Sequence, residues 1–414
     1  MLHAEDVPLS AIAETVGTPV YVYSRATLER HAAVFLAAVE AARPTNRGIE
    51  VAFAVKANPN LAVLRVLARA GMGADVVSAG EIERALAAGV APARIVFSGV
   101  GKTMSELGRG LDIEIGQFNI ESEGEGRDLA ALAASRGKTA QATLRVNPDV
   151  DARTHAKIST GRADNKFGVA IDAAPAVYAR LAELPGLRLE GVALHIGSMI
   201  ADLAPLEAAF ARIGALVAEL RAAGHRVSRV DLGGGIGVTY RPGDVFPEPA
   251  AYGAMVARVT RGWDVTLMFE PGRLIVGNAG VLLTRVIRVK PGAVDPFVVV
   301  DAAMNDLARP ALYDAYHHFE PVVETSRMMT ANIVGPVCES GDTFATGRTF
   351  GCIASGELGV FRTAGAYGAT MASTYNSRDL VPEVLVDGDR FAVVAERIPA
   401  ARLLAAEHVP DWLD

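Results

Sequence analysis

A lysine stands at the end of a strand-like apolar stretch, EVAFAVKAN, directly before a turn. Because side chains alternate along a strand, the pattern predicts that Lys56 shares one face with Ala52 and Ala54. These two small side chains leave room beside the amine. A lysine amine in a partly desolvated site is a nucleophile, whereas a lysine at the end of an ordinary strand only extends its amine into water. The residues that the fold brings near Lys56 decide between these interpretations.

Further strand-like runs follow along the chain, each ending in polar residues or glycine and each followed by a helical pattern. They are GADVVSAG, RIVFSGVG, GQFNIES, ATLRVNPD, GVALHIGS, RVDLGGGIG and LMFEPGR. Strands that alternate with helices predict right-handed β-α-β units and a parallel sheet. With the Lys56 stretch they make eight units over about residues 30 to 280, which predicts an α/β barrel of the (β/α)8, TIM-like type.

The chain changes character after Gly280. Segments such as VLLTRVIRVK, PFVVVDAAM and EVLVDGDRFAVVAER are β-rich, and glycine, proline and aspartate mark the turns between them. The stretch TPVYVYS near the N-terminus is a further strand pattern, which we expect to join these later strands. The sequence therefore predicts a barrel over residues 29–280 and a mostly antiparallel β domain formed by residues 1–28 and 281–414.

Length and composition exclude several classes of protein. A chain of 414 residues exceeds the size at which one core stops growing, which predicts two domains. A formal charge of −7 without a lysine- or arginine-rich block argues against nucleic-acid binding. No apolar run is long enough to span a bilayer, so no membrane partner is expected. The N-terminus lacks a secretory pattern and only two cysteines are present, which predicts a cytoplasmic protein without a disulfide scaffold or a metal site.

Polar residues and glycines gather where the predicted strands end. In a barrel of this type the carboxyl ends of the strands meet on one face, and chemistry takes place there. The set holds an amine, an imidazole, a glycine cluster, and a carboxylate beside a guanidinium. Its members are Lys56, Asp75, Ser98, Asn119, Asn147, His195, Gly233, Gly234, Gly235, Glu270 and Arg273.

The glycines of DLGGGIG, residues 231 to 237, have two interpretations. They permit a sharp turn after a strand, and they also let backbone N–H groups approach an anion closely. The motif follows the seventh predicted strand, and barrels often bind phosphate after their seventh and eighth strands. This position favours a phosphate cradle that includes Gly234 and Gly235. The spacing is not that of a dinucleotide-binding motif.

The stretch FEPGR places Glu270 close to Arg273. The two residues could form a structural ion pair. Alternatively, a carboxylate beside the ring nitrogen of a pyridine keeps that nitrogen protonated, which makes the ring a strong electron acceptor. An amine, a phosphate cradle and such a carboxylate are the three fixtures that pyridoxal phosphate requires. His195 could then lie flat on the ring, although a lone histidine is more often a hydrogen-bonded core residue.

Four motifs together carry a family resemblance over nearly the whole chain. FAVKANPN, HIGS, GGGIG and EPGR resemble the Schiff-base, ring-stacking, phosphate and ring-nitrogen motifs of the fold-type III pyridoxal-phosphate decarboxylases. The resemblance implies that the cofactor is pyridoxal 5'-phosphate and that Lys56 binds it covalently. The implied cofactor-binding residues are Lys56, Asp75, His195, Ser198, Gly234, Gly235, Glu270, Gly272, Arg273 and Tyr367.

Two stretches resemble the branch of this family that acts on diaminopimelate. They are MNDLARPALYDAYH, residues 304 to 317, and STGRADNKFG, residues 159 to 168. In the first stretch Arg309 and Tyr313 match substrate-binding positions. The planar fork of an arginine binds a second carboxylate bidentately and repels the terminal amine of an ornithine-type substrate.

GPVCESGD, residues 335 to 342, supplies the remaining chemistry by the same resemblance. Cys338 is implied as the catalytic proton donor and Glu339 as the group that binds the distal ammonium of the substrate. In the family both residues enter the site from the partner subunit, which implies a homodimer with shared active sites. Taken alone, Cys338 is equally compatible with a small buried hydrophobe, and Tyr367 with an ordinary core tyrosine.

The resemblance thus implies a carboxy-lyase of lysine biosynthesis that converts meso-2,6-diaminopimelate into L-lysine and CO2. Arg273, Arg309, Tyr313, Glu339 and Tyr367 would bind the substrate. Two alternatives stay open at this point. One is a related decarboxylase of ornithine, arginine or carboxynorspermidine. The other is a non-catalytic pyridoxal-phosphate-binding or regulatory homologue.

Overall fold

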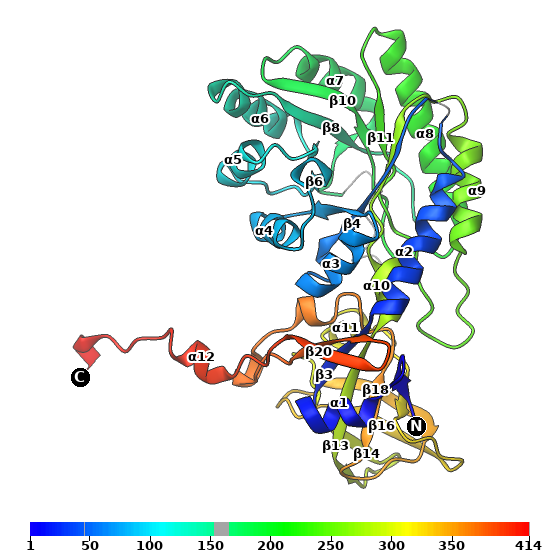
Figure 1. Ribbon diagram of the computed structural model, residues 1–414, viewed down its shortest axis with the longest axis vertical. Coiled ribbons are helices and arrows are strands. Elements are labelled where there is room, and N and C mark those ends of the chain that lie inside the picture. The colour runs from blue at the N-terminus through cyan, green and yellow to red at the C-terminus, as the bar shows by residue number, and fades with distance from the viewer. Residues whose placement is uncertain (45, 153–164, 414) are drawn as a thin grey trace. The chain divides into compact units, whose positions relative to one another are not determined.

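The computed structural model describes residues 1–44, 46–152 and 165–413 of the 414-residue chain (Figure 1). Most of the STGRADNKFG stretch therefore lies outside the described residues. Contacts divide the chain into two compact units. The barrel unit comprises Leu28–Val238 and Val245–Ile275, and the β-rich unit comprises Met1–Thr27, Thr239–Asp244 and Val276–Asp414. The short segment Thr239–Asp244 groups with the β-rich unit although it lies within the barrel range of the sequence.

The barrel unit contains a closed ring of eight parallel strands, as the sequence predicts. Each strand pairs in parallel with the next, and the eighth returns to pair with the first through Leu267 and Ile49. In ring order the strands are β4 (Ile49–Ala54), β5 (Gly73–Val76), β6 (Ile95–Phe97), β7 (Gln117–Ile120), β8 (Ala140–Asn147), β10 (Leu187–Ala193), β11 (Arg229–Asp231) and β12 (Thr266–Phe269). A short β9 (Val169–Ala170) pairs with β8.

One helix precedes the first of these strands and others follow the strands, and the helices lie outside the ring (Figure 1). Side-chain caps define several of their first turns, because the side-chain oxygens of Asn60, Ser78, Thr103, Ser122 and Asp202 accept backbone N–H groups there. The helices are α2 (Arg25–Glu40), α3 (Leu61–Arg69), α4 (Ala79–Ala87), α5 (Met104–Asp112), α6 (Glu123–Ser135), α7 (Ala174–Ala182), α8 (Leu203–Ala222), α9 (Pro249–Val259) and α10 (Arg273–Val276).

One local prediction is wrong. Strand β4 ends at Ala54, and Lys56 lies in a 3-10 turn, Val55–Ala57, rather than on the strand face of Ala52 and Ala54. The N–H of Ala54 donates to the carbonyl of Pro271, and the chain then closes a turn in which the N–H of Asn58 donates to the Val55 carbonyl. The alternation of side chains along β4 therefore does not extend to Lys56.

The β-rich unit is built around β13 (Gly280–Lys290), which pairs antiparallel with three other strands. One of them is the N-terminal β3 (Val20–Ser24), so this segment does join the later strands. The core contains Val20, Val22, Leu283, Val360 and Val384. The other strands are β14 (Phe297–Val300), β15 (Phe319–Pro321), β16 (Met328–Val334), β17 (Thr343–Gly351), β18 (Leu358–Phe361), β19 (Glu383–Asp387) and β20 (Arg390–Ala395), with a small hairpin of β1 (His3–Ala4) and β2 (Val7–Pro8).

Most pairs in this unit are antiparallel, as the sequence predicts, and β14–β16 and β3–β19 are parallel. Its helices are α1 (Leu9–Val16), α11 (Arg309–Tyr313) and α12 (Ala400–Leu404).

Further 3-10 turns occur in both units, at Pro92–Arg94, Ile171–Ala173, Gly277–Ala279, Ala369–Met371, Tyr375–Ser377 and Asp411–Leu413. In the part of the chain that the structure describes, no helix combines the length and apolarity that crossing a bilayer requires.

A close backbone approach between β10 and β11 gives a first test of the barrel. Gly191 pairs with Arg229, and a Cβ at Gly191 would come within 1.8 Å of the Arg229 carbonyl oxygen. Gly191→Ala therefore has to force the two strands apart. We expect it to destabilise the protein by about 1–3 kcal/mol, measured as a lower midpoint of urea unfolding. Gly101→Ala is the control, because a Cβ there meets nothing within 4 Å. An equal shift in both variants would contradict this account.

Candidate active site

Lys56 and Asp75 form an ion pair at the carboxyl ends of two neighbouring strands. Ala54 pairs in register with Asp75, so strand pairing brings the carboxylate beside the turn that carries Lys56. The Nζ of Lys56 lies 2.9 Å from Oδ2 of Asp75. Asp75 is fully buried, and its Oδ1 has no hydrogen-bond partner among the described residues. The Lys56 side chain is 39% exposed, so the amine is held by a buried charge and is still accessible to a ligand.

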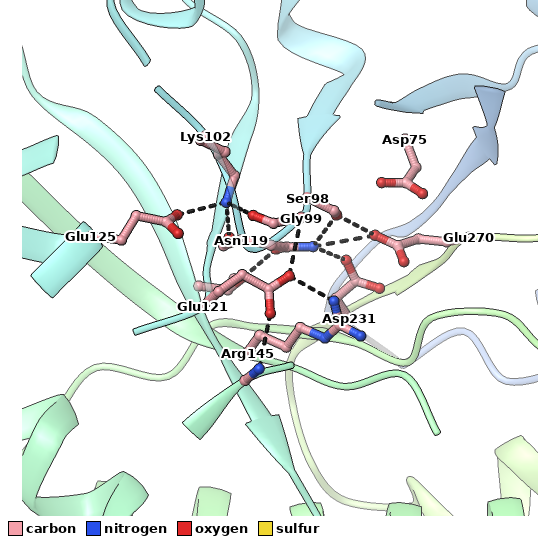
Figure 2. Close-up of polar contacts among 12 residues, drawn as sticks. Asp75, Ser98, Gly99, Lys102, Asn119, Glu121, Glu125, Arg145, Asp231 and Glu270 are labelled. Atoms are coloured by element: carbon pink, nitrogen blue, oxygen red, sulfur yellow. Dashed lines mark hydrogen bonds and ion pairs between the residues drawn. The ribbon is translucent and has the colours of Figure 1, made fainter. Parts of the chain in front are cut away.

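Glu270 follows β12 and faces the same end of the barrel. Its Oε1 accepts from Nδ2 of Asn119 at 3.2 Å and from Oγ of Ser98 at 3.4 Å (Figure 2). Burial raises the pKa of Glu270 well above its ordinary value, and the nearby carboxylates of Asp231 and Asp75 raise it further. This environment favours a protonated Glu270.

Asp231 is a second carboxylate at this end, and the sequence analysis did not single it out. It is buried at the end of β11 and accepts from Nδ2 of Asn119 and Nε2 of Gln117, both at 3.2 Å. Its Oδ1 accepts the N–H of Gly233 at 2.9 Å, which fixes the start of the glycine loop. The signal that could have found it is its place at a predicted strand end, two residues before the first of three glycines.

The glycine loop, the HIGS loop and the EPGR loop approach one another closely. A Cβ at Gly234 would lie 2.2 Å from the carbonyl oxygen of Glu270, and a Cβ at Gly235 would lie 2.4 Å from that of Gly197. Gly235 also has a φ of +120°, which side chains rarely adopt. The lack of side chains at these glycines therefore lets the three loops pack this closely. A glycine-rich turn at the carboxyl end of the barrel strands suits a phosphate group.

Two polar side chains accompany this cradle. The Nη2 of Arg273 donates to Oγ of Ser198 at 3.3 Å, and Arg273 is buried. Gly272 precedes Arg273, and a Cβ there would come within 3.2 Å of the methyl groups of Ala54 and Ala57. Gly272 thus lets the loop of Arg273 lie against the turn of Lys56.

His195 also lies at this end of the barrel, after β10. Burial lowers its pKa to about 3, and the charges of Arg145 and Lys56 act in the same direction. The N–H of Gly234 donates to Nδ1 of His195 at 3.4 Å. A neutral imidazole in this position offers a flat ring without repelling the neighbouring cations.

A layer of charged pairs supports these residues, and the sequence analysis missed it. Glu121 accepts from Nη1 of Arg145 at 2.6 Å and from the N–H groups of Gly99 at 3.0 Å and Gly168 at 2.9 Å. Figure 2 shows Glu121 between Arg145 and Gly99. One carboxylate thus fixes three segments of the barrel.

Lys102 anchors the strand end of Asn119 in a similar way. Its Nζ is fully buried and pairs with Oε1 of Glu125 at 2.6 Å. It also donates to the carbonyl oxygens of Gly99 and Asn119, both at 2.8 Å (Figure 2). A buried lysine with three satisfied donors is a structural group rather than a reactive one.

The predicted site residues divide between the two units. The barrel unit holds Lys56, Asp75, His195, Ser198, Gly234, Gly235, Glu270, Gly272 and Arg273. The β-rich unit holds Arg309, Tyr313, Cys338, Glu339 and Tyr367.

Arg309 begins α11 and is buried in the β-rich unit. Its Nη1 lies 2.9 Å from Nε2 of His317, and its guanidinium lies 4.7 Å from the ring centre of Tyr240. Tyr313 ends the same helix and is partly exposed. This contact joins the segment Thr239–Asp244 to the rest of the β-rich unit. Sequence reasoning could not identify Tyr240 as a neighbour of Arg309.

Cys338 is exposed, so the interpretation as a small buried hydrophobe is wrong. Its loop, residues 335–342, is fixed by the buried Asp342. The Asp342 carboxylate accepts the N–H of Val337 and the N–H of Met304, both at 2.7 Å. It thereby links the loop of Cys338 to the segment that leads into Arg309.

Tyr367 is partly exposed, and its φ of +56° lies in the left-handed region. That conformation is uncommon for an aromatic residue and is typical of functional sites. Tyr367 is therefore not an ordinary core tyrosine.

Comparisons with known proteins identify the family of this chain. Residues 27–277 match the family model "Pyridoxal-dependent decarboxylase, pyridoxal binding domain". A diaminopimelate decarboxylase of Zymomonas mobilis is 52% identical, with 100% of this chain and 98% of the relative covered. One from Pseudomonas aeruginosa is 49% identical, with 98% and 96% covered.

A solved structure gives the same result. The diaminopimelate decarboxylase of M. jannaschii in complex with L-lysine is 34% identical, with a TM-score of 0.94 and with 98% of this chain and 95% of that chain covered. The resemblance inferred from the sequence motifs is confirmed. With its barrel, its lysine–carboxylate pair and its glycine cradle, the chain belongs to the pyridoxal-dependent decarboxylase family.

Proposed function

We propose that this chain is a carboxy-lyase that converts meso-2,6-diaminopimelate into L-lysine and CO2, the last step of lysine biosynthesis, with pyridoxal 5'-phosphate as its cofactor. The observation that carries the proposal is the arrangement around Lys56. Its amine pairs with the buried Asp75, and the same end of the barrel carries Glu270 and the glycine cradle. Full-length relatives that bear the name of this activity support it.

The residues of the barrel unit fit the cofactor. When bound, pyridoxal phosphate supplies an aldehyde that captures an amine and a protonated ring that accepts the electron pair released with CO2. Lys56 would hold the aldehyde carbon, and Asp75 would orient the amine. Glu270, whose protonated form burial favours, would hold a proton at the ring nitrogen. The unpartnered Oδ1 of Asp75 leaves one acceptor for the bound group.

The phosphate and the ring face have their own partners. The cradle of Gly234 and Gly235 would present N–H groups to the phosphate, and Ser198 and Arg273 would add a hydroxyl and a positive charge. His195, kept neutral by burial, would stack on the ring. Gly272 would keep the Arg273 loop close, and Tyr367 would lie beside the phosphate.

Most of the residues that would bind the substrate belong to the β-rich unit, and Arg273 belongs to the barrel unit. Arg309 and Arg273 would bind the distal carboxylate, Glu339 the distal ammonium, and Tyr313 and Tyr367 would add hydroxyl groups. Cys338 would donate a proton to the carbon that has lost CO2. Removal of one carboxylate from the meso substrate then leaves the distal L centre intact, which gives L-lysine.

We also propose that the enzyme is a homodimer with shared sites and that it works in the cytoplasm. Cys338 and Glu339 are both exposed in the single chain, which supports a role in a site that a second subunit completes. Cys338 and Cys352 are free thiols, which suits a reducing compartment.

The direct test is CO2 release with added pyridoxal phosphate. We expect turnover of meso-diaminopimelate and none of L-ornithine, L-arginine or L-lysine. Turnover of a diamine-forming substrate alone would overturn the assignment of Arg309. If all four substrates failed while the cofactor still bound, a non-catalytic role would replace the proposal.

Lys56→Ala should abolish both turnover and the absorbance that covalently bound cofactor shows near the visible edge, because no amine remains to hold the aldehyde. Lys56→Arg is the matched variant, since it keeps the positive charge beside Asp75 and lacks a nucleophilic amine. Absorbance spectra and CO2 release measure the two effects. Normal turnover in either variant would refute the role of Lys56.

Arg309→Lys should raise the KM for meso-diaminopimelate about 10-fold or more, because the charge stays and the bidentate fork is lost. The dissociation constant of the cofactor should change by less than about twofold, since Arg309 is assigned to the substrate. Steady-state kinetics and a cofactor titration give the two values. Similar losses in both would contradict the assignment, and the unfolding midpoint controls for damage to this buried position.

Glu270 also predicts a pH dependence of stability. Because the folded protein raises the pKa of Glu270, it binds more protons than the unfolded chain above about pH 4.5. Its contribution therefore becomes less favourable as the pH rises. Glu270→Gln removes this dependence. The free energy of unfolding of the cofactor-free variant, minus that of the cofactor-free parent, should therefore increase as the pH is raised from 5 to 8. Urea unfolding at several pH values measures the difference, and a constant difference would refute the prediction.

A further inference from the structure

The short segment Tyr375–Asn376 contacts two neighbouring residues of the loop that carries Cys338. The hydroxyl of Tyr375 donates to Oε2 of Glu339 at 2.8 Å. The Oδ1 of Asn376 accepts the backbone N–H of Cys338 at 3.2 Å. All four residues belong to the β-rich unit. The consecutive residues Tyr375 and Asn376 therefore hold the consecutive residues Glu339 and Cys338 of the loop.

This segment is itself anchored on both sides. Before it, Ser373 exchanges two hydrogen bonds with Asn305, one through its N–H at 2.9 Å and one through its carbonyl at 3.1 Å. After it, Arg378 donates to Oδ1 of Asn305 at 3.0 Å and to the carbonyl of Asp301 at 2.6 Å. Asn376 adopts the left-handed conformation, with φ 57° and ψ 27°, which asparagine tolerates better than most residues. The segment is thus a fixed support.

Packing alone does not set the directions of Cys338 and Glu339, because both residues are exposed. The loop base is fixed by Asp342, whose carboxylate holds the N–H of Val337. Beyond that point, the hydrogen bond that Tyr375 donates to Glu339 and the one that Asn376 accepts from the Cys338 N–H orient the two functional residues. The bond to Glu339 raises the pKa of Tyr375, so its hydroxyl remains a donor.

We propose that Tyr375 and Asn376 are positioning residues for the decarboxylation: Tyr375 orients the Glu339 carboxylate toward the distal ammonium of the substrate, and Asn376 fixes the backbone from which the Cys338 thiol delivers its proton. The hydroxyl of Tyr375 donates a hydrogen bond to Oε2 of Glu339, which leaves Oε1 to bind the substrate. This proposal rests on the roles of Cys338 and Glu339 in the proposed function. In this proposal Tyr375 affects the affinity for the substrate, and Asn376 affects the rate of proton transfer.

Tyr375→Phe removes only the hydroxyl. We expect the KM for meso-diaminopimelate to rise about three- to tenfold with little change in kcat, as for the loss of one hydrogen bond to a charged group. Glu339→Gln should raise KM further. If Tyr375 acts through Glu339, the double variant should be no worse than Glu339→Gln alone. Additive losses in the double variant would overturn the Tyr375 assignment.

Asn376 offers a matched pair of variants. Asn376→Gly keeps the left-handed backbone and removes the acceptor, whereas Asn376→Asp keeps both. We expect Asn376→Gly to lower kcat at least fivefold with KM nearly unchanged, and Asn376→Asp to retain most of kcat. Hydrogen exchange at the Cys338 amide, measured in the cofactor-free chain by mass spectrometry, should be faster in Asn376→Gly only. Unchanged exchange and unchanged kcat in Asn376→Gly would refute the Asn376 assignment.

The two proposals fail in different ways. If Cys338→Ala and Glu339→Gln leave kcat and KM unchanged, the roles given to them in the proposed function are wrong. If those variants are impaired while Tyr375→Phe and Asn376→Gly behave as the parent does, the positioning proposal alone is wrong. Equal kcat losses in Asn376→Gly and Asn376→Asp, with lower unfolding midpoints in both, would show a purely structural role and would also refute it.

Discussion

Three carboxyl groups gathered at the end of the barrel form the constraint on which the site depends. Asp75 and Asp231 are buried, and both raise the pKa of the neighbouring Glu270. Such a cluster is unfavourable unless donors surround it. Lys56 compensates Asp75, while the amide of Asn119 donates to both Glu270 and Asp231. The pKa of Glu270 is raised because these donors do not fully compensate the neighbouring carboxylates and burial.

The surrounding barrel makes this cluster possible. Parallel strand pairing sets Asp75 beside the turn of Lys56 without any flexible connection. The amine of Lys102 and the carboxylate of Glu121 then tie together the loops behind the site, using backbone groups of Gly99 in both cases. Buried hydrogen-bonded charges of this kind restrict the motion of the backbone that they join. The strand ends and loops around Ser98, Asn119 and Gly168 are thus held by groups outside the Lys56–Glu270 cluster.

Sequence reasoning identified the eight strands, because each carries a local apolar pattern, and it identified the glycine and EPGR loops by their positions at strand ends. It was wrong about the local structure of Lys56, because the strand ends at Ala54 and Lys56 lies in the 3-10 turn that follows. It also missed Asp231 and the stacking of Tyr240 on Arg309. The stacking of Tyr240 on Arg309 joins distant parts of the chain and leaves no local pattern, whereas Asp231 has a local signal in its position beside the glycine motif.

The order of the two units along the chain has a consequence for biosynthesis. The barrel unit interrupts the β-rich unit, so β3 is made early, while both of its partners, β13 and β19, are made only after the barrel. During translation, more than 250 further residues are therefore synthesised before the Val20–Ser24 segment has a strand to pair with. Because the barrel strands pair mainly with neighbours in sequence, this unit can fold first. A ribosome-bound chain would thus complete its cofactor cradle before the segment that carries Cys338 exists.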